Sequence, residues 1–136
     1  MNAKDIDARK LLSLAREART RAYAPYSHFS VGACLLCASG RTYTGCNIEN
    51  LSFGATVCAE RVALFRAISE GEREFLAIAV VGGREDDTSP CMPCGICRQV
   101  MAELCPKEFS VILCDGEEEI SYSLSELLPM GFEASL

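Results

Sequence analysis

Apolar residues recur three and four positions apart in the first part of the chain, and this spacing predicts an amphipathic helix over about residues 3–22. The apolar face of this helix comprises Leu11, Leu12, Ala15, Ala18 and Ala22. Residues 30–38 then form a nearly continuous apolar run, which is typical of a buried strand, and residues 41–46 follow a Ser-Gly turn as its hairpin partner. The chain therefore begins with a helix and an antiparallel strand pair.

Two helix-and-strand units follow. One helix is predicted from about Val57 to Gly71, before the apolar run 75–81, and a shorter one through residues 96–104, before the apolar run 109–114. Unbroken apolar runs are typical of strands that are covered on both faces. Because a helix joins these two strands, we expect them to be parallel.

The last part of the chain predicts a short fifth strand near Ile120 and a final helix, which Ser123 and Glu126 would cap. The whole pattern indicates an α/β fold, a three-layer α/β/α sandwich around a mixed sheet of about five strands. The length of 136 residues fits one domain, so we expect residues 1–136 to form a single domain.

The charge balance argues against a nucleic-acid partner. The formal net charge is −6, and the basic residues that do cluster lie on the first predicted helix, as on an ordinary solvated face. No apolar run approaches the roughly 18 residues that a membrane span needs. Since the N-terminus lacks the basic-then-apolar order of a signal peptide, we expect a cytoplasmic protein with no membrane partner.

Nine cysteines in such a chain indicate metal binding and reduced core thiols better than disulfides. Cys34, Cys37, Cys46 and Cys114 lie in apolar, strand-like stretches, where a thiol packs as a small apolar side chain.

Cys58, Cys94 and Cys97 are different, because all three lie where a predicted helix begins. Free N–H groups and the helix dipole at such positions favour thiolates. Three thiolates on a tetrahedral Zn²⁺ leave the fourth position open for water, which distinguishes a catalytic from a structural site. We therefore expect one Zn²⁺ per chain, with Arg61 and Arg98 as candidates to donate hydrogen bonds to a ligand sulfur.

Glu60 lies two positions after Cys58. An acidic residue in a first helical turn gains from the helix dipole in any protein. Beside a zinc ligand, however, the same carboxylate can carry a proton during catalysis, and we interpret Glu60 as the catalytic acid and base.

Residues 56–61 (Thr-Val-Cys-Ala-Glu-Arg) and 93–99 (Pro-Cys-Gly-Ile-Cys-Arg-Gln) resemble the two signatures of the cytidine deaminases, in the small branch with three cysteine ligands. Further matches are at residues 26–33, 47–50 and 127–129, so that the resemblance covers about residues 8–132. It implies a homotetramer with sites shared between subunits, and a role in pyrimidine salvage.

The resemblance also implies a reaction. Zinc supplies hydroxide, which attacks C4 of the pyrimidine, and Glu60 moves the water's proton to N3 and then helps protonate the departing ammonia. The substrates would be cytidine and 2′-deoxycytidine, and the products uridine and 2′-deoxyuridine.

Six positions match the family's substrate contacts. Asn47 and Glu49 resemble the ribose-binding pair, on a segment that includes Ile48. Phe29 matches the aromatic residue that packs on the pyrimidine, and the backbone of Ala59 is expected to contact the base. Phe132 resembles the aromatic residue that reaches a neighbouring subunit's site.

Alternatives remain open. Cys91 extends the motif to a C-x-x-C-x-x-C run, and a fourth thiolate on the metal would close the catalytic site. Two interpretations involve binding without catalysis. One is a structural zinc module with four cysteine ligands, and the other is an iron–sulfur cluster that also uses Cys105. Blasticidin S and bases within nucleic acid are the alternative substrates. His28 is expected to be a solvent-facing loop residue.

Overall fold

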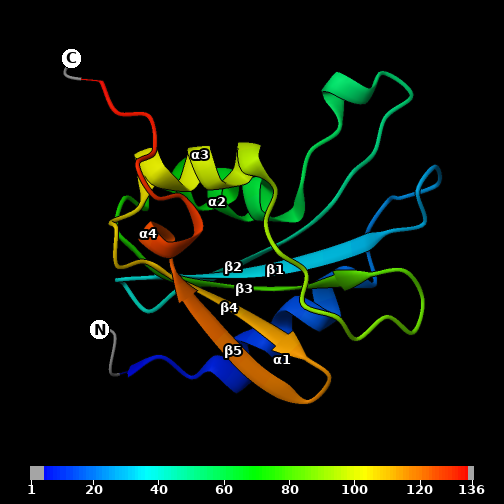
Figure 1. The fold of residues 1–136 in the computed structure, drawn as a ribbon, viewed down its shortest axis with the longest axis horizontal. Helices are drawn as coiled ribbons and strands as arrows, with labels where there is room; N and C mark the ends of the chain where they lie inside the picture. Colours follow the sequence, from blue (N-terminus) through cyan, green and yellow to red (C-terminus); the bar gives the residue numbers. More distant parts are fainter. Residues whose placement is uncertain (1–4, 135–136) are drawn as a thin grey trace.

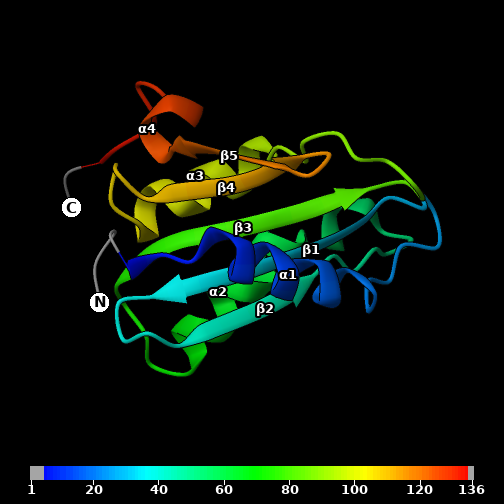
Figure 2. The ribbon, with the colours of Figure 1, turned by 90° about the horizontal axis from the view of Figure 1, so that it is seen from below.

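A five-stranded mixed sheet forms the centre of the computed structural model, which describes residues 5–134. The strand order is β2-β1-β3-β4-β5, and only β3 and β4 pair in parallel (Figures 1 and 2). The strands are β1 (Ser30–Cys37), β2 (Thr42–Cys46), β3 (Phe75–Gly83), β4 (Ser110–Asp115) and β5 (Glu118–Ser123). The predicted mixed sheet and its parallel pair are confirmed.

Helices lie on both faces of this sheet. The helices are α1 (Ala8–Arg19), α2 (Ala59–Ser69), α3 (Gly95–Leu104) and α4 (Leu124–Leu127), with a short 3₁₀ helix, η2, at Phe53–Ala55. Figure 1 shows α2 and α3 on one side of the sheet and α1 on the other. The α/β/α sandwich is therefore confirmed, and no helix within residues 5–134 is long and apolar enough to cross a bilayer.

Alternation along β1 explains the two layers of core. Ala33 and Leu35 face the cluster that includes α2 and α3, whereas Cys34 and Leu36 face the cluster around α1. Gly32 lets α1 approach β1 closely, because a Cβ there would collide with the backbone at Ala15. Cys34 and Cys37 are fully buried, as predicted, while Cys46 and Cys114 are half-buried.

The first helix is shorter than its apolar pattern predicts. Asp7 caps it, because its Oδ1 accepts a hydrogen bond from the Lys10 N–H at 3.1 Å. At the other end, the helix stops at Arg19 and the chain turns, with Arg21 and Ala22 donating to carbonyls three positions back. Residues 3 and 4 of the prediction lie outside the described residues.

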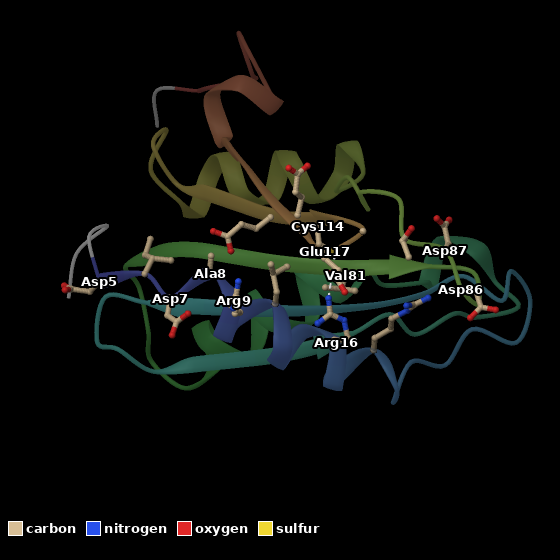
Figure 3. Close-up of a pocket in the computed structure, with 17 residues that line it drawn as sticks. Asp5, Asp7, Ala8, Arg9, Arg16, Val81, Asp86, Asp87, Cys114 and Glu117 are labelled. Carbon is tan, nitrogen blue, oxygen red and sulfur yellow. Dashed lines mark hydrogen bonds between the residues drawn. The ribbon is translucent and has the colours of Figure 1, made fainter.

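A groove of about 1560 Å³ lies on the α1 side of the sheet (Figure 3). Its walls are mainly charged: Arg9 and Arg16 of α1 line it, and so do acidic residues such as Asp86, Asp87 and Glu117. Its floor includes Val81 and Cys114, which lie on the face of the sheet away from α2 and α3. The groove is thus separated from the three predicted zinc ligands by the sheet.

Candidate active site

The three predicted zinc ligands come together at the N-termini of α2 and α3. Cys58 is the N-cap of α2, Cys94 is the N-cap of α3, and Cys97 lies one turn into α3. Their Sγ atoms all lie within 4.8 Å of one another, and those of Cys58 and Cys94 are 3.6 Å apart. This is a preformed three-sulfur group.

Gly45 on β2 allows α2 to reach this position. A Cβ at Gly45 would lie 2.5 Å from the carbonyl oxygen of Ala59 and 2.6 Å from the amide nitrogen of Ala63. Both distances are too short for any side chain, so only glycine lets the first turn of α2 lie directly on the strand. The sequence offers no signal for this role, since it depends on where the helix crosses the sheet.

Arg61 supports the sulfur group from within α2. Its Nη2 donates to Cys58 Sγ at 3.5 Å, and its buried Nε has no hydrogen-bond partner. Hydrogen bonds from Cys97 and Arg61 lower the pKa of the Cys58 thiol to about 5. The bond to Cys58 and burial raise the pKa of Cys97 far above its ordinary value.

Glu60 lies beside this group in the first turn of α2 and is only 4% exposed. Burial raises the pKa of its carboxyl to about 7, and the charge on Cys58 acts in the same direction. A carboxyl that titrates near neutrality can both accept and donate a proton under physiological conditions. The ionised form of a carboxyl buried in this place would be costly without a cation close to it.

Arg98 does not point to a sulfur, in contrast to the prediction. Its Nε donates to the Pro93 carbonyl at 2.8 Å, and its Nη1 donates to the Leu127 carbonyl at 2.7 Å. The guanidinium extends between the loop before α3 and the end of α4, and its two hydrogen bonds both go to backbone carbonyls. Arg98 therefore contacts the residue before Cys94, at its carbonyl group, and not a ligand sulfur.

Cys91 lies outside the three-sulfur group found among the described residues. Its Sγ packs against β3, 2.9 Å from the position that a Cβ on Gly82 would take. Burial raises the pKa of this thiol to about 12, which disfavours the thiolate that a metal needs. Cys105, the other cysteine of the iron–sulfur interpretation, is buried in the core under α2 and α3. The geometry therefore favours a three-sulfur site over either four-cysteine alternative.

The segment 47–49 is joined directly to the start of α2. Ile48 and Val57 exchange two backbone hydrogen bonds of 3.0 Å, and Val57 precedes Cys58. On its other side, Ile48 bridges to Tyr23. The segment that resembles the ribose-binding motif and the segment that leads into the first predicted zinc ligand thus lie side by side.

The side chain of Asn47 is buried, and both its oxygen and its nitrogen make a hydrogen bond to the backbone. Its Oδ1 accepts from the Val31 N–H at 2.8 Å, and its Nδ2 donates to the Phe29 carbonyl at 2.8 Å. These bonds fix the entry of the chain into β1 and with it the place of Phe29, which is 38% exposed. This structural role could not be predicted from the sequence, because both partners of the side chain are backbone groups.

Glu49 fixes the loop before β1. Its Oε1 accepts from the amides of Tyr26 and Ser27 at 3.0 and 3.1 Å, and its Oε2 accepts from the Ser27 hydroxyl at 2.5 Å. The Ser27 hydroxyl contributes most to lowering the pKa of Glu49. The same carboxylate lines a cavity of about 290 Å³ together with Phe53 of η2. Ser27, which our prediction of site residues omitted, belongs to this cluster.

The remaining predicted residues differ in accessibility. Ile48 is 45% exposed and Phe132 is 74% exposed, in the segment after α4. Ala59 is fully buried in the single chain, and the contact of its backbone with the base stays a prediction. His28 adopts a left-handed conformation, with φ of 59°, in the loop before β1, and it is not part of the sulfur group.

The chemistry of the site fits zinc. Thiolates prefer soft or borderline cations such as Zn²⁺, three of them suit a tetrahedral ion with one free position, and Arg61 offsets their charge.

Comparison with known proteins agrees with this geometry. A family model described as the cytidine and deoxycytidylate deaminase zinc-binding region matches residues 5–113. A cytidine deaminase of Halalkalibacterium halodurans is 52% identical over 130 residues, covering 95% of this chain and 96% of that protein. A second one, of Sporosarcina psychrophila, is 46% identical over 128 residues, covering 93% and 92%.

Solved structures give the same answer for the fold. The crystal structure of a cytidine deaminase from Burkholderia pseudomallei matches with a TM-score of 0.86 and 45% identity, over 93% of this chain and all of that one. With the zinc-binding region matched over both cysteine motifs, the chain belongs to the cytidine and deoxycytidylate deaminase family.

Proposed function

We propose that the protein catalyses the zinc-dependent hydrolysis of cytidine and 2′-deoxycytidine to uridine and 2′-deoxyuridine, with release of ammonia. The observation that carries this proposal is the juxtaposition of three converging sulfurs with the buried carboxyl of Glu60. Relatives that are about half identical over nearly the whole chain are named cytidine deaminases, which supports the choice of substrate.

Cys58, Cys94 and Cys97 would hold the metal. Bound to three protein ligands, a zinc ion makes water a nucleophile at neutral pH, because it lowers the pKa of that water. Arg61 keeps Cys58 charged and oriented through its hydrogen bond to the sulfur.

Glu60 would move the protons of the reaction. Hydrolysis puts the water oxygen on C4 of the pyrimidine, one of the water's protons on N3 and the other on the departing ammonia. A single carboxyl can carry both protons in turn if its pKa lies near the working pH, and burial raises the pKa of Glu60 in that direction. A nearby cation would favour its ionised form, so that the carboxyl starts the cycle as a base.

A free nucleoside fits the surface next to the sulfurs better than a nucleotide. Glu49 is ionised over the neutral range, because the Ser27 hydroxyl and two amides hold its pKa below the ordinary value. An ionised carboxylate accepts hydrogen bonds from ribose hydroxyls and repels a phosphate. Phe29 would pack on the base, and Asn47, Ile48 and the Ala59 backbone would complete the contacts.

Association into a homotetramer is part of this proposal. Several large apolar side chains are exposed on the single chain, and exposed apolar patches often mark contacts between proteins. They include Leu51, Phe53, Ile96, Met130 and Phe132. We propose that subunit contacts cover them and bring Phe132 to a neighbouring site; light scattering on the purified protein tests this, and a fully active monomer would contradict it.

The cellular setting follows from the thiols. Cysteine ligands bind zinc only in their reduced form, so we propose that the protein works in the reducing cytoplasm. We further propose that it acts as a single catalytic domain, as its length allows, and that it serves pyrimidine salvage, as the family resemblance implies.

The decisive experiment compares the wild-type protein with Glu60→Ala at equal zinc content. Loss of cytidine ultraviolet absorbance with the wild type alone would support both the reaction and the role of Glu60. If neither protein acted on cytidine although each held one zinc per chain, the substrate would be wrong, and blasticidin S would be tested next.

A further inference from the structure

Arg98 binds both carbonyls that flank the α-carbon of a zinc ligand. Its side-chain Nε donates to the Pro93 carbonyl at 2.8 Å, and its backbone N–H donates to the Cys94 carbonyl at 3.0 Å. The second bond is the ordinary one of an α-helix, whereas the first is specific to the guanidinium. One residue therefore fixes the two peptide units that decide where the Cys94 sulfur points.

Cys94 has little else to hold it. It is an N-cap whose side chain makes no capping bond, with ψ of 168°, so its backbone is extended rather than helical. Its residue is exposed, while Pro93 before it is fully buried. A ligand in such a place depends on its neighbours for its direction.

The other end of the guanidinium is anchored on a different element. Nη1 donates to the Leu127 carbonyl at 2.7 Å, at the last residue of α4. Helix-end carbonyls lack a partner within the helix, so a cation is a favourable partner there. Within residues 5–134, neither salt bridge involves Arg98, which leaves both of its side-chain bonds to the backbone.

We propose that Arg98 is a positioning residue for the zinc site, and that it acts through the Pro93 carbonyl rather than through its charge or a contact with sulfur. This inference rests on the assignment of the three cysteines as zinc ligands. Outer-shell contacts of this kind typically change metal affinity by about 10- to 100-fold when removed.

A pair of substitutions separates the two bonds. In Arg98→Gln, the amide nitrogen stands as many bonds from the backbone as the arginine Nε, so it can still donate to Pro93, but it cannot reach Leu127 and carries no charge. In Arg98→Lys, the charge and a donor that can extend toward Leu127 remain, but a carbon replaces Nε, and the Pro93 bond is lost.

The measurement is the rate at which the zinc-loaded proteins release the metal to an excess of a chromophoric chelator, with the melting temperature recorded in parallel. We expect Arg98→Lys to release zinc at least about tenfold faster than the wild type and Arg98→Gln to resemble the wild type. A purely structural role would lower the melting temperatures without this order of release rates.

Equal release rates in both variants, or faster release from Arg98→Gln, would overturn the inference, because charge or the α4 anchor would then matter more than Pro93. The zinc content of the wild type separates a failure of the ligand assignment from a failure of the role of Arg98. If it held no zinc, the ligand assignment itself would fail; if it held zinc and Arg98→Lys released the metal no faster, only the role of Arg98 would fail.

Discussion

The Nη2 atom of Arg61 lies 3.5 Å from the sulfur of Cys58, one helical turn away in α2. Three thiolates around one Zn²⁺ leave a net negative charge, which weakens the metal as an acid. A guanidinium at this distance withdraws charge from one sulfur and also fixes its direction. Arg61 of α2 should thus make a zinc ion bound to Cys58 a stronger Lewis acid.

Replacing Arg61 by Gln should lower zinc affinity by about 10- to 100-fold, because the Cys58 thiolate loses its charged donor. Competition titration against a chelator of known affinity measures this. Arg66→Gln is a suitable control, since Arg66 lies in the same helix but donates to the Thr44 carbonyl. A similar loss in both variants would mean that helix charge, and not the sulfur contact, is responsible.

Replacing Cys91 by Ala should leave one zinc per chain and full turnover, because its thiol packs against β3 and burial raises its pKa to about 12. Metal analysis and the cytidine assay test this together. Cys94→Ala, in the same loop, should by contrast lose the metal. A Cys91→Ala protein without zinc would show that this thiol is a fourth ligand.

The hydrogen bond between Ser27 and Glu49 should make the stability of the loop before β1 depend on pH. Because this bond favours the ionised carboxylate and lowers the pKa of Glu49, its contribution to loop stability is present above the ordinary pKa of 4.5 and is lost as the pH falls through the lowered value. Ser27→Ala should therefore raise the pKa of Glu49 in an NMR titration. The control Ser52→Ala, in the next loop, should not, and an unchanged pKa in Ser27→Ala would contradict the assignment.

Gly45→Ala should destabilise the protein by about 1–3 kcal/mol, because the added methyl group overpacks the contact between β2 and the first turn of α2. Since α2 carries Cys58 and Glu60, zinc affinity should fall together with the free energy of unfolding. Urea unfolding and zinc competition measure the two effects. Gly54→Ala is the matched control, as a Cβ there meets no atom within 4 Å. Unchanged zinc affinity in Gly45→Ala would contradict this prediction, because it would show that the metal site does not depend on how α2 packs on β2.

Much of the fold could be predicted from the sequence because apolar runs and helical spacing are local signals. The parallel pairing of β3 and β4 followed from two such runs and the helix between them. The first helix was predicted too long, since a small apolar residue such as Ala22 continues a helical pattern although the chain has already turned. An apolar pattern shows which face is buried but not where the helix ends.

The candidate site could be predicted only where a motif determines the chemistry. Metal ligands are predicted by the short spacing between Cys94 and Cys97. The acid is predicted by the position of Glu60, two residues after Cys58. Each signal lies within a turn or two of one helix. The contacts of Arg98 and Asn47 could not be predicted, because each joins elements that are far apart in the sequence. Their partners are backbone groups, which every residue carries and which therefore leave no trace in a motif.

The separation of Cys58 and Cys94 by 36 positions, with β3 between them, affects how the protein acquires its metal. Cys94 and Cys97 are close in the sequence and can meet an ion early in folding. Cys58 can join them only after the chain has paid the entropy of closing a long loop around a central strand. We therefore expect the three-sulfur site to be completed late in folding, so that tight zinc binding would report a chain whose strands have already paired correctly.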